Sequence, residues 1–166
     1  MPLRHTVYCR QSTIALAPSG LLKHLEMLDF LSLAEDCGIS TDAVKGARPL
    51  RIKDIQSGEF RLYHLSYGDG SRRPIEIDRW TDDLHRGAVN ETIDNLTIKD
   101  RERVERINDF LRNSLDSVSV AFGTDPLAAM FAWEVVRCVA SRFDGIVHAD
   151  DGDWLTIGSD YQAKPV

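Results

Sequence analysis

The sequence contains few of the features that mark secreted, membrane-spanning or redox-active proteins. Its 166 residues include three cysteines, Cys9, Cys37 and Cys138, and no Cys-x-x-Cys pair. No segment approaches the ~18 uncharged apolar residues that a membrane span requires, and the first residues lack the apolar stretch of an export signal. We therefore expect a cytoplasmic protein with reduced cysteines and no membrane partner.

Positive charge is also scarce, because 20 Lys and Arg residues face 26 Asp and Glu residues, which gives a formal net charge of −6. Proteins that bind DNA or RNA neutralise phosphates with clustered Lys and Arg, so we do not expect a nucleic acid as partner. Motifs for nucleotide binding, for a serine nucleophile and for zinc fingers are missing as well. The sequence therefore predicts no catalytic residue, no cofactor and no bound metal.

What is present describes one folded domain. Hydrophobic residues make up 43% of the chain and charged residues 28%, which is too apolar for intrinsic disorder. A chain of this length can bury roughly 70% of its unfolded surface around a single core. No low-complexity tract or long Gly/Ser/Pro-rich linker divides the sequence, so we interpret residues 1–166 as a single domain.

Local patterns predict both strands and helices. Alternating or β-favouring residues predict strands at 6–10, 60–67, 75–78, 117–123, 146–148 and 154–157. Apolar residues at helical spacing predict helices at 18–36, 82–96, 100–113 and 126–142, the first as one helix or as two short ones. The segment 45–56 is expected to be loop with a short extended piece, because Pro49 opposes helix there. We predict an α+β fold, a mixed, mostly antiparallel sheet with two strand-helix-hairpin units and helices packed on it.

The helix predicted at 126–142 is apolar on nearly all sides, and we expect it to be the most buried helix of the fold. Only Glu134, Arg137 and Ser141 interrupt its surface, and their spacing confines them to one narrow stripe. We interpret Glu134 and Arg137 as an ion pair along the side of the helix that reaches solvent.

The turn of the second hairpin is rich in acidic residues. Asp150, Asp151 and Asp153 follow His148 within a few positions, and ligands of this kind can hold a hard cation. The spacing nevertheless lacks the alternating ligands, central glycine and distal Glu of a calcium-binding loop. We therefore interpret this segment as a solvent-exposed turn with Asp-Gly geometry.

Arginines gather on the first hairpin instead, so the net charge conceals two local fields of opposite sign. Four residues of this hairpin are candidates to line a pocket for an anionic ligand: Arg61, His64, Arg72 and Arg73. The alternative is that these arginines lie along a sheet edge or pair with the nearby carboxylates of Glu76 and Asp78.

Both ends of the chain resemble bacterial proteins. The run from Leu21 to Ile39, preceded by Val7-Tyr8-Cys9-Arg10, resembles the opening of uncharacterised bacterial domains of unknown function. The run from Trp133 to Trp154, a buried helix followed by an Asp-Gly hairpin, is similar to the ends of small cytosolic immunity proteins from bacterial toxin systems. The resemblance implies a non-enzymatic binder, in some cases one whose acidic surface neutralises a toxin. It carries no catalytic motif, so no functional residue is transferred from it.

We therefore expect a non-enzymatic bacterial binding protein, in its sharpest form an immunity-type inhibitor that sequesters a basic protein toxin. Aromatic and acidic side chains are its expected contacts: Trp80, Asp82, Asp83, Asp150, Asp151, Asp153 and Trp154. The alternative is a small hydrolase or metal-assisted enzyme that uses the segment from His148 to Asp153 or the hairpin around His64.

Overall fold

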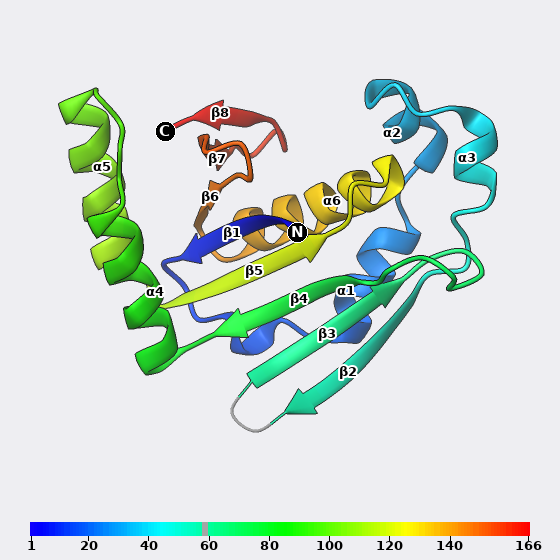
Figure 1. Ribbon diagram of the computed structural model, residues 1–166, viewed down its shortest axis with the longest axis horizontal. Helices are drawn as coiled ribbons and strands as arrows, with labels where there is room; N and C mark the ends of the chain where they lie inside the picture. Colours follow the sequence, from blue (N-terminus) through cyan, green and yellow to red (C-terminus); the bar gives the residue numbers. More distant parts are fainter. Residues whose placement is uncertain (58–59) are drawn as a thin grey trace.

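One antiparallel sheet runs through the molecule (Figure 1). The computed structural model describes residues 1–57 and 60–166, and every strand in these residues belongs to this sheet, in the order β2-β3-β4-β5-β1-β6-β7-β8. The strands are β1 (Leu3–Cys9), β2 (Arg51–Ser57), β3 (Phe60–Ser66), β4 (Ile75–Trp80), β5 (Asp116–Phe122), β6 (Gly145–His148), β7 (Trp154–Ile157) and β8 (Ala163–Pro165). The predicted α+β class is confirmed, and the described pairings are all antiparallel rather than mixed.

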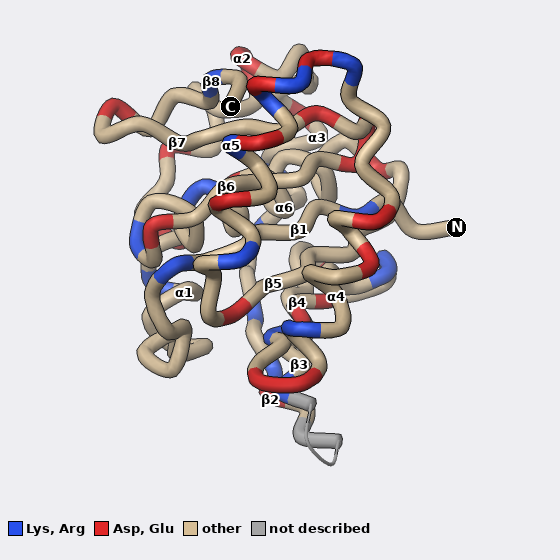
Figure 2. Tube along the Cα trace, turned by 90° about the vertical axis from the view of Figure 1, so that its left-hand side faces the viewer, with Lys and Arg blue, Asp and Glu red and all other residues tan. Residues whose placement is uncertain are grey.

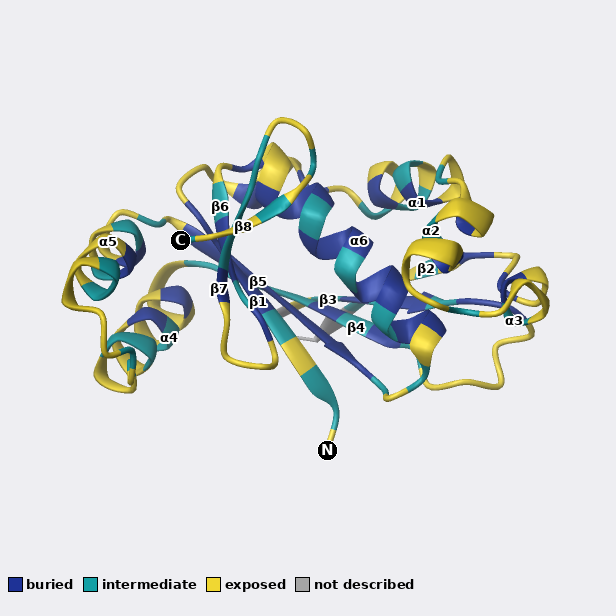
Figure 3. Cartoon of the chain, turned by 90° about the horizontal axis from the view of Figure 1, so that it is seen from above, coloured by how far each residue is buried: buried dark blue, intermediate teal, exposed yellow. Residues whose placement is uncertain are grey.

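The helices lie in two groups (Figure 3). Their bounds are α1 (Pro18–Glu26), α2 (Phe30–Asp36), α3 (Thr41–Lys45), α4 (Asp82–Asp94), α5 (Arg101–Arg112) and α6 (Pro126–Arg142), with a short 3-10 turn, η1, at Thr13–Ala15. Helices α1, α2 and α6 lie on one side of the sheet, and α3 contacts α2. Helices α4 and α5 cover only one end of the opposite side, where they pack on β1, β6 and β7.

The two predicted units are present, and each hairpin is extended by a third strand. The first unit is β1, the helices α1 to α3 and the meander β2-β3-β4, and the second is β5, α6 and the meander β6-β7-β8. The two single strands pair with each other at the centre of the sheet, with Val7 opposite Val118. β5 borders the last strand of the first meander, whereas β1 borders the first strand of the second. The units are therefore not related by an internal two-fold axis.

Apolar side chains point to both faces of the sheet, and they form two separate cores. The larger core lies between the sheet and α6, and its fully buried members include Val7, Ile77, Val120, Phe131 and Val135. Ile75 and Ile77 face inward as the sequence predicts. The smaller core lies on the other side of the sheet under α4 and α5, and it is built around Tyr8, Ile107, Leu111, Ile146 and Trp154. Complete burial of an aliphatic side chain contributes about 1.5–3 kcal/mol, so both layers are held mainly by these contacts.

Helix α6 is the most buried helix, as predicted, and the bounds of 126–142 are confirmed. Pro126 fills its first turn, and the Asp125 carboxylate accepts a hydrogen bond from the Leu127 N–H at 3.2 Å. The ion pair between Arg137 and Glu134 is confirmed at 3.2 Å, but the expectation that it lies along a solvent-facing side is wrong for Glu134, which is only 4% exposed. Burial raises the pKa of the Glu134 carboxyl, and the adjacent Arg137 charge opposes that rise.

The segment expected to be loop with a short extended piece is a strand in its second half. Residues 51–57 form β2, the edge strand beyond β3. Its charged residues Arg51, Lys53 and Asp54 are exposed, which is typical of an edge strand that must not pair with other chains. None of the helices in residues 1–57 and 60–166 has the length and apolar character needed to cross a membrane.

Candidate functional site

One face of the sheet remains open beside α4. Because side chains alternate along a strand, Ile75 and Ile77 point toward the larger core, whereas Glu76, Asp78 and Trp80 of β4 point to the other side. Helices α4 and α5 cover that side at β1, β6 and β7 and at the start of β5 (Figure 3). The outward side chains of β4 therefore meet α4 at the border between the covered and the open part of the face.

Hydrogen bonds from two strands hold α4 in this position. The hydroxyls of Tyr8 in β1 and Thr92 in α4 are 2.7 Å apart. His85 Nε2 lies 3.1 Å from the Ser114 carbonyl oxygen, which can only accept, so this nitrogen carries the proton. His85 Nδ1 then accepts the hydroxyl proton of Ser117 at 3.1 Å. Burial lowers the pKa of His85, so its imidazole is neutral near pH 7 and fits both bonds.

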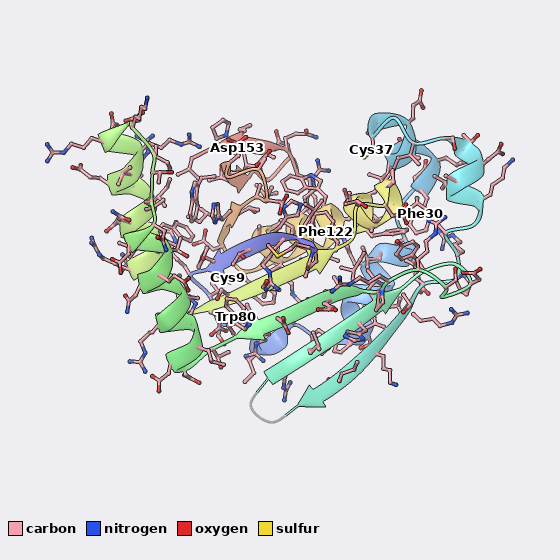
Figure 4. The ribbon with its side chains drawn as sticks, viewed as in Figure 1. Cys9, Phe30, Cys37, Trp80, Phe122 and Asp153 are labelled. Atoms are coloured by element: carbon pink, nitrogen blue, oxygen red, sulfur yellow. The ribbon has the colours of Figure 1, made fainter. Side chains whose placement is uncertain are left out.

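A cleft of about 460 Å³ lies between α4 and the open face. It is lined by Arg4 of β1, Asp78 and Trp80 of β4, and Asp83, Leu84, Gly87, Ala88 and Glu91 of α4. Figure 4 shows Trp80 at the end of β4, next to the start of α4. The lining thus combines an apolar wall with three carboxylates and one guanidinium.

The Asp78 carboxylate is the half-buried acidic group of the cleft. Burial raises its pKa above the ordinary value for an aspartate, the Arg4 charge opposes this rise, and Glu76 adds to it. Arg4 donates from Nη1 to the Ser119 hydroxyl at 2.7 Å, which holds its side chain against the sheet. No hydrogen-bond donor reaches the Asp78 carboxylate among residues 1–57 and 60–166. This acid is therefore available to a guest in the cleft.

The acidic turn of the second hairpin lies beside the same strand. The backbone N–H of Arg4 donates to the Asp150 carboxylate at 2.9 Å, and the Asp150 N–H donates to Nδ1 of His5 at 3.0 Å. Asp151 accepts a hydrogen bond from the Asp153 N–H at 3.0 Å, and both side chains are exposed. The predicted solvent-exposed turn is confirmed, and through Arg4 it lies next to the cleft.

The other acidic segment proposed from sequence, 82–83, lies at the start of α4. Asp82 and Asp83 are exposed in the first turn of α4, where negative charge is favourable to the helix dipole. Asp83 lines the cleft, and it also accepts a hydrogen bond from Arg86 at 2.6 Å. Trp80 lines the cleft as well, so two of the proposed contact residues, Trp80 and Asp83, belong to its lining.

Trp154 is different, and the expectation that it contacts a partner is wrong. Its side chain is 1% exposed. It stacks on His148 with ring centroids 4.4 Å apart and lies 5.9 Å from the Tyr8 ring. In the short strand β7, Trp154 points into the smaller core. It therefore stabilises the packing on the sheet and is not available to a partner.

The anion pocket proposed for the first hairpin is also wrong. Arg61 and His64 are three residues apart on β3, so their side chains lie on opposite faces of the sheet. Arg72 lies beyond the other end of β3 and donates to Asp125 at 2.8 Å, and Arg73 pairs with Glu76 at 3.2 Å. The alternative interpretation, in which these arginines pair with Glu76 or Asp78, is confirmed for Arg73, whereas Arg72 pairs with Asp125 instead.

The metal-assisted alternative gains no support from the described part of the chain. Among residues 1–57 and 60–166, no three His, Cys, Asp or Glu side chains are arranged to hold a metal ion. His148 packs flat against Trp154, and burial lowers its pKa. Its ring is therefore a neutral part of the core boundary.

The sequence did not reveal Arg4, Asp78 and Glu91 as site residues. Asp78 carried a usable signal, since it alternates with Ile75 and Ile77 and so had to face away from the core. Arg4 carried none, because its place beside Asp78 depends on β1 lying next to β5 in the sheet.

No family model matches the chain, and neither a curated protein nor a solved structure is found to match it.

Proposed function

We propose that this chain is a non-enzymatic binding protein whose partner is a basic protein, and that it acts as an immunity-type inhibitor by covering that partner. The observation that carries the proposal is the cleft itself, which brings the carboxylates of Asp78, Asp83 and Glu91 together with Trp80 in its wall. The exposed acidic turn at 150–153 adds further negative charge nearby, since Asp150 accepts a hydrogen bond from the backbone of Arg4, another lining residue. Charge of one sign around a concave site attracts a partner of the opposite sign and speeds encounter.

Helix α4 is the acidic surface of this end of the molecule, whereas α5 is not. In α5 the charges alternate in sign along the helix (Figure 2), and Arg101 with Glu105 and Arg106 with Glu102 form ion pairs at 3.0 and 2.8 Å. The residues of α4 that face solvent include four acids, Asp82, Asp83, Glu91 and Asp94, and the single cation Arg86. A basic partner is thus attracted to α4 and the cleft rather than to α5.

The cleft provides a central contact residue for a protein interface, and the surface around it provides the area to be buried. Stable interfaces bury about 800 Å² on each partner and depend on a few central aromatic or charged residues. Trp80 is partly exposed at the cleft wall, and the neighbouring open strands β3 and β4 extend the surface. The partner would therefore seat on the open face, with the cleft near the centre of the contact.

The test is capture of the partner by the immobilised protein from a lysate of its source cells, at low and at moderate salt. We expect a basic protein to be retained by the wild type and lost from the triple variant Asp78→Asn/Asp83→Asn/Glu91→Gln. The matched control Glu35→Gln/Asp36→Asn/Asp109→Asn changes the net charge equally, at exposed sites outside the cleft, and should retain it.

Higher salt should weaken the capture, because exposed charges are screened over a Debye length of about 8–10 Å. The proposal fails if no stable partner is retained at either salt concentration. It also fails if the retained protein is acidic, or if both triple variants hold it as firmly as the wild type does.

A further inference from the structure

The chemistry of the cleft is specific enough to name what enters it. We propose that the cleft receives one arginine side chain, and this inference rests on the proposed function, because the arginine belongs to the basic partner protein. The guanidinium binds Asp78, and the aliphatic stem lies against Trp80, Leu84 and Ala88.

The Asp78 carboxylate in the cleft favours a positively charged hydrogen-bond donor as its partner. Asp78 is half-buried, its oxygens lack donors among the described residues, and its burial is unfavourable to the ionised form. A carboxylate in such a place gains most from a cation that brings hydrogen-bond donors with it. Hydrogen bonds with ionised partners on both sides are shorter and about twice as strong as neutral ones.

The apolar wall of the cleft favours a bound side chain with a long aliphatic stem. Leu84 is 40% exposed on the free side of α4, and Trp80 and Ala88 are partly exposed next to it. A hydrated inorganic cation would leave this wall in water. A long side chain covers it with methylene groups while its charged end reaches the acid, as arginine and lysine commonly do on protein surfaces.

Arginine fits the arrangement better than lysine. Its planar guanidinium presents five donors in a fork that binds a carboxylate through two parallel hydrogen bonds, and it stacks on an aromatic face. Asp78 supplies the carboxylate and Trp80 the aromatic face. Asp83 and Glu91 on the α4 side can accept from the remaining N–H groups.

Arg4 sets the strength of the site. Its guanidinium is already bonded to Ser119, the cross-strand neighbour of Asp78, and its charge acts on the Asp78 carboxylate. It therefore opposes a second cation without blocking the carboxylate. Removing its charge should tighten the binding of a guest arginine, and removing the Asp78 charge should weaken it. A site built for an anion would respond to these two changes with the opposite signs.

The test is a titration of the full chain with the peptide acetyl-Gly-Arg-Gly-amide, followed by NMR at the Trp80 indole N–H. The matched probes carry lysine or the uncharged isostere citrulline in the central position. We expect the arginine peptide to shift the Trp80 signal with saturation in the millimolar range, the lysine peptide to bind more weakly, and the citrulline peptide not to bind.

Substitutions assign the site. Asp78→Asn should weaken the arginine peptide by roughly 10- to 100-fold, the usual cost of a lost hydrogen bond between charged groups, and Arg4→Gln should tighten it. Asp36→Asn should leave it unchanged, because Asp36 lies at the end of α2, across the molecule from α4 (Figure 1). Asp78→Asn removes a charge that burial disfavours, so the fold is expected to persist, and its cooperative unfolding provides the check.

The inference is overturned if arginine and lysine peptides bind equally, if the Trp80 signal does not move, or if Asp78→Asn has no effect. Its failure is separable from that of the proposed function. Capture of a basic protein that depends on the cleft acids, without peptide binding, would leave the proposed function intact and remove the arginine anchor. Peptide binding without any captured protein would keep the arginine site and remove the proposed function.

Discussion

Gly68, which follows β3, occupies a position that only glycine fits. Its φ is +65°, and a Cβ there would lie 2.5 Å from the carbonyl oxygen of Gly46. Its N–H also donates to the Ala47 carbonyl at 2.9 Å, so the two backbone segments cannot easily separate. A side chain would meet both an unfavourable backbone conformation and a rigid neighbour.

Gly68→Ala should therefore lower the free energy of unfolding by about 1–3 kcal/mol, measured by urea denaturation. Gly20 in α1 provides the control, because a Cβ there meets no atom within 4 Å. Gly20→Ala should raise the free energy of unfolding by about 0.5–1 kcal/mol, the usual gain for an exposed helical position. Equal effects at both sites would contradict the crowding at Gly68.

A buried polar network fastens the chain after β1 to the sheet. Thr13 donates to the Asp116 carboxylate from its N–H at 2.6 Å and from its hydroxyl at 2.9 Å. Arg79 of β4 donates to the Thr13 hydroxyl at 2.6 Å, and its guanidinium lies 3.8 Å from the Asp116 carboxylate. The side chains of Arg79 and Asp116 are only 10% and 8% exposed. One carboxylate thus joins η1, β4 and the start of β5.

Asp116→Ala should lower the free energy of unfolding by about 3–5 kcal/mol, because it leaves the Arg79 charge buried without its partner. The double variant Asp116→Ala/Arg79→Met should recover part of the loss, since no charge then remains in the interior. Glu105→Ala breaks an exposed pair with Arg101 and should cost about 0–1 kcal/mol. A cost for Asp116→Ala no larger than for Glu105→Ala would show that the buried network does not stabilise the fold.

Elements with strong local signals could be predicted from sequence. The helix predicted at 100–113 is observed at Arg101–Arg112, where the Asp100 side chain caps the Arg103 N–H at 3.2 Å. The short elements α3 and β8 escaped prediction, and β2 was foreseen only as a short extended piece within a loop. β2 mixes charged and apolar residues after Pro49 and lies at an edge, so its pattern differs little from that of a loop.

The candidate site was predictable only in its local parts. Trp80 and Asp83 could be named because a strand end and a helix start carry recognisable patterns. The meeting of Arg4 with Asp78, and of Arg4 with Asp150, follows from the strand order, which local periodicity does not encode. The burial of Trp154 depends on helices α4 and α5, which lie more than forty residues away in the chain. No local sequence pattern around Trp154 predicts this burial.

At the scale of the whole molecule, three partly or fully buried histidines link stability to pH: His5 beside Phe122 and Trp133, and His85 and His148 on the other side of the sheet. Burial lowers the pKa of His5, His85 and His148 below their ordinary value of 6.5. As the pH falls below about 6.5, the unfolded chain takes up protons that the folded protein resists. The stability contributed by neutral histidines is thus present above this pH and is lost as the pH falls through the lower pKa values of the folded state.

We therefore expect the free energy of unfolding, measured in urea at a series of pH values, to decline between about pH 6.5 and 5. The carboxyls of Asp78 and Glu134 oppose this trend, because burial raises their pKa values and protonation favours the folded state. His85→Asn retains one hydrogen-bonding group but does not titrate, so its decline should be shallower. A stability that stays constant from pH 7 to pH 5 in both proteins would contradict the link.

β1 lies at the centre of the sheet, so the sheet can close only after the strands on both sides of β1 have been made. Synthesis delivers this strand long before its two neighbours, because Leu3 pairs with Phe122 and Thr6 pairs with His148. Closing such long loops costs entropy before any contact compensates for it, and topologies of this kind fold slowly. β1 leaves the ribosome without either neighbour, so the centre of the sheet cannot close until β5 and β6 have followed it.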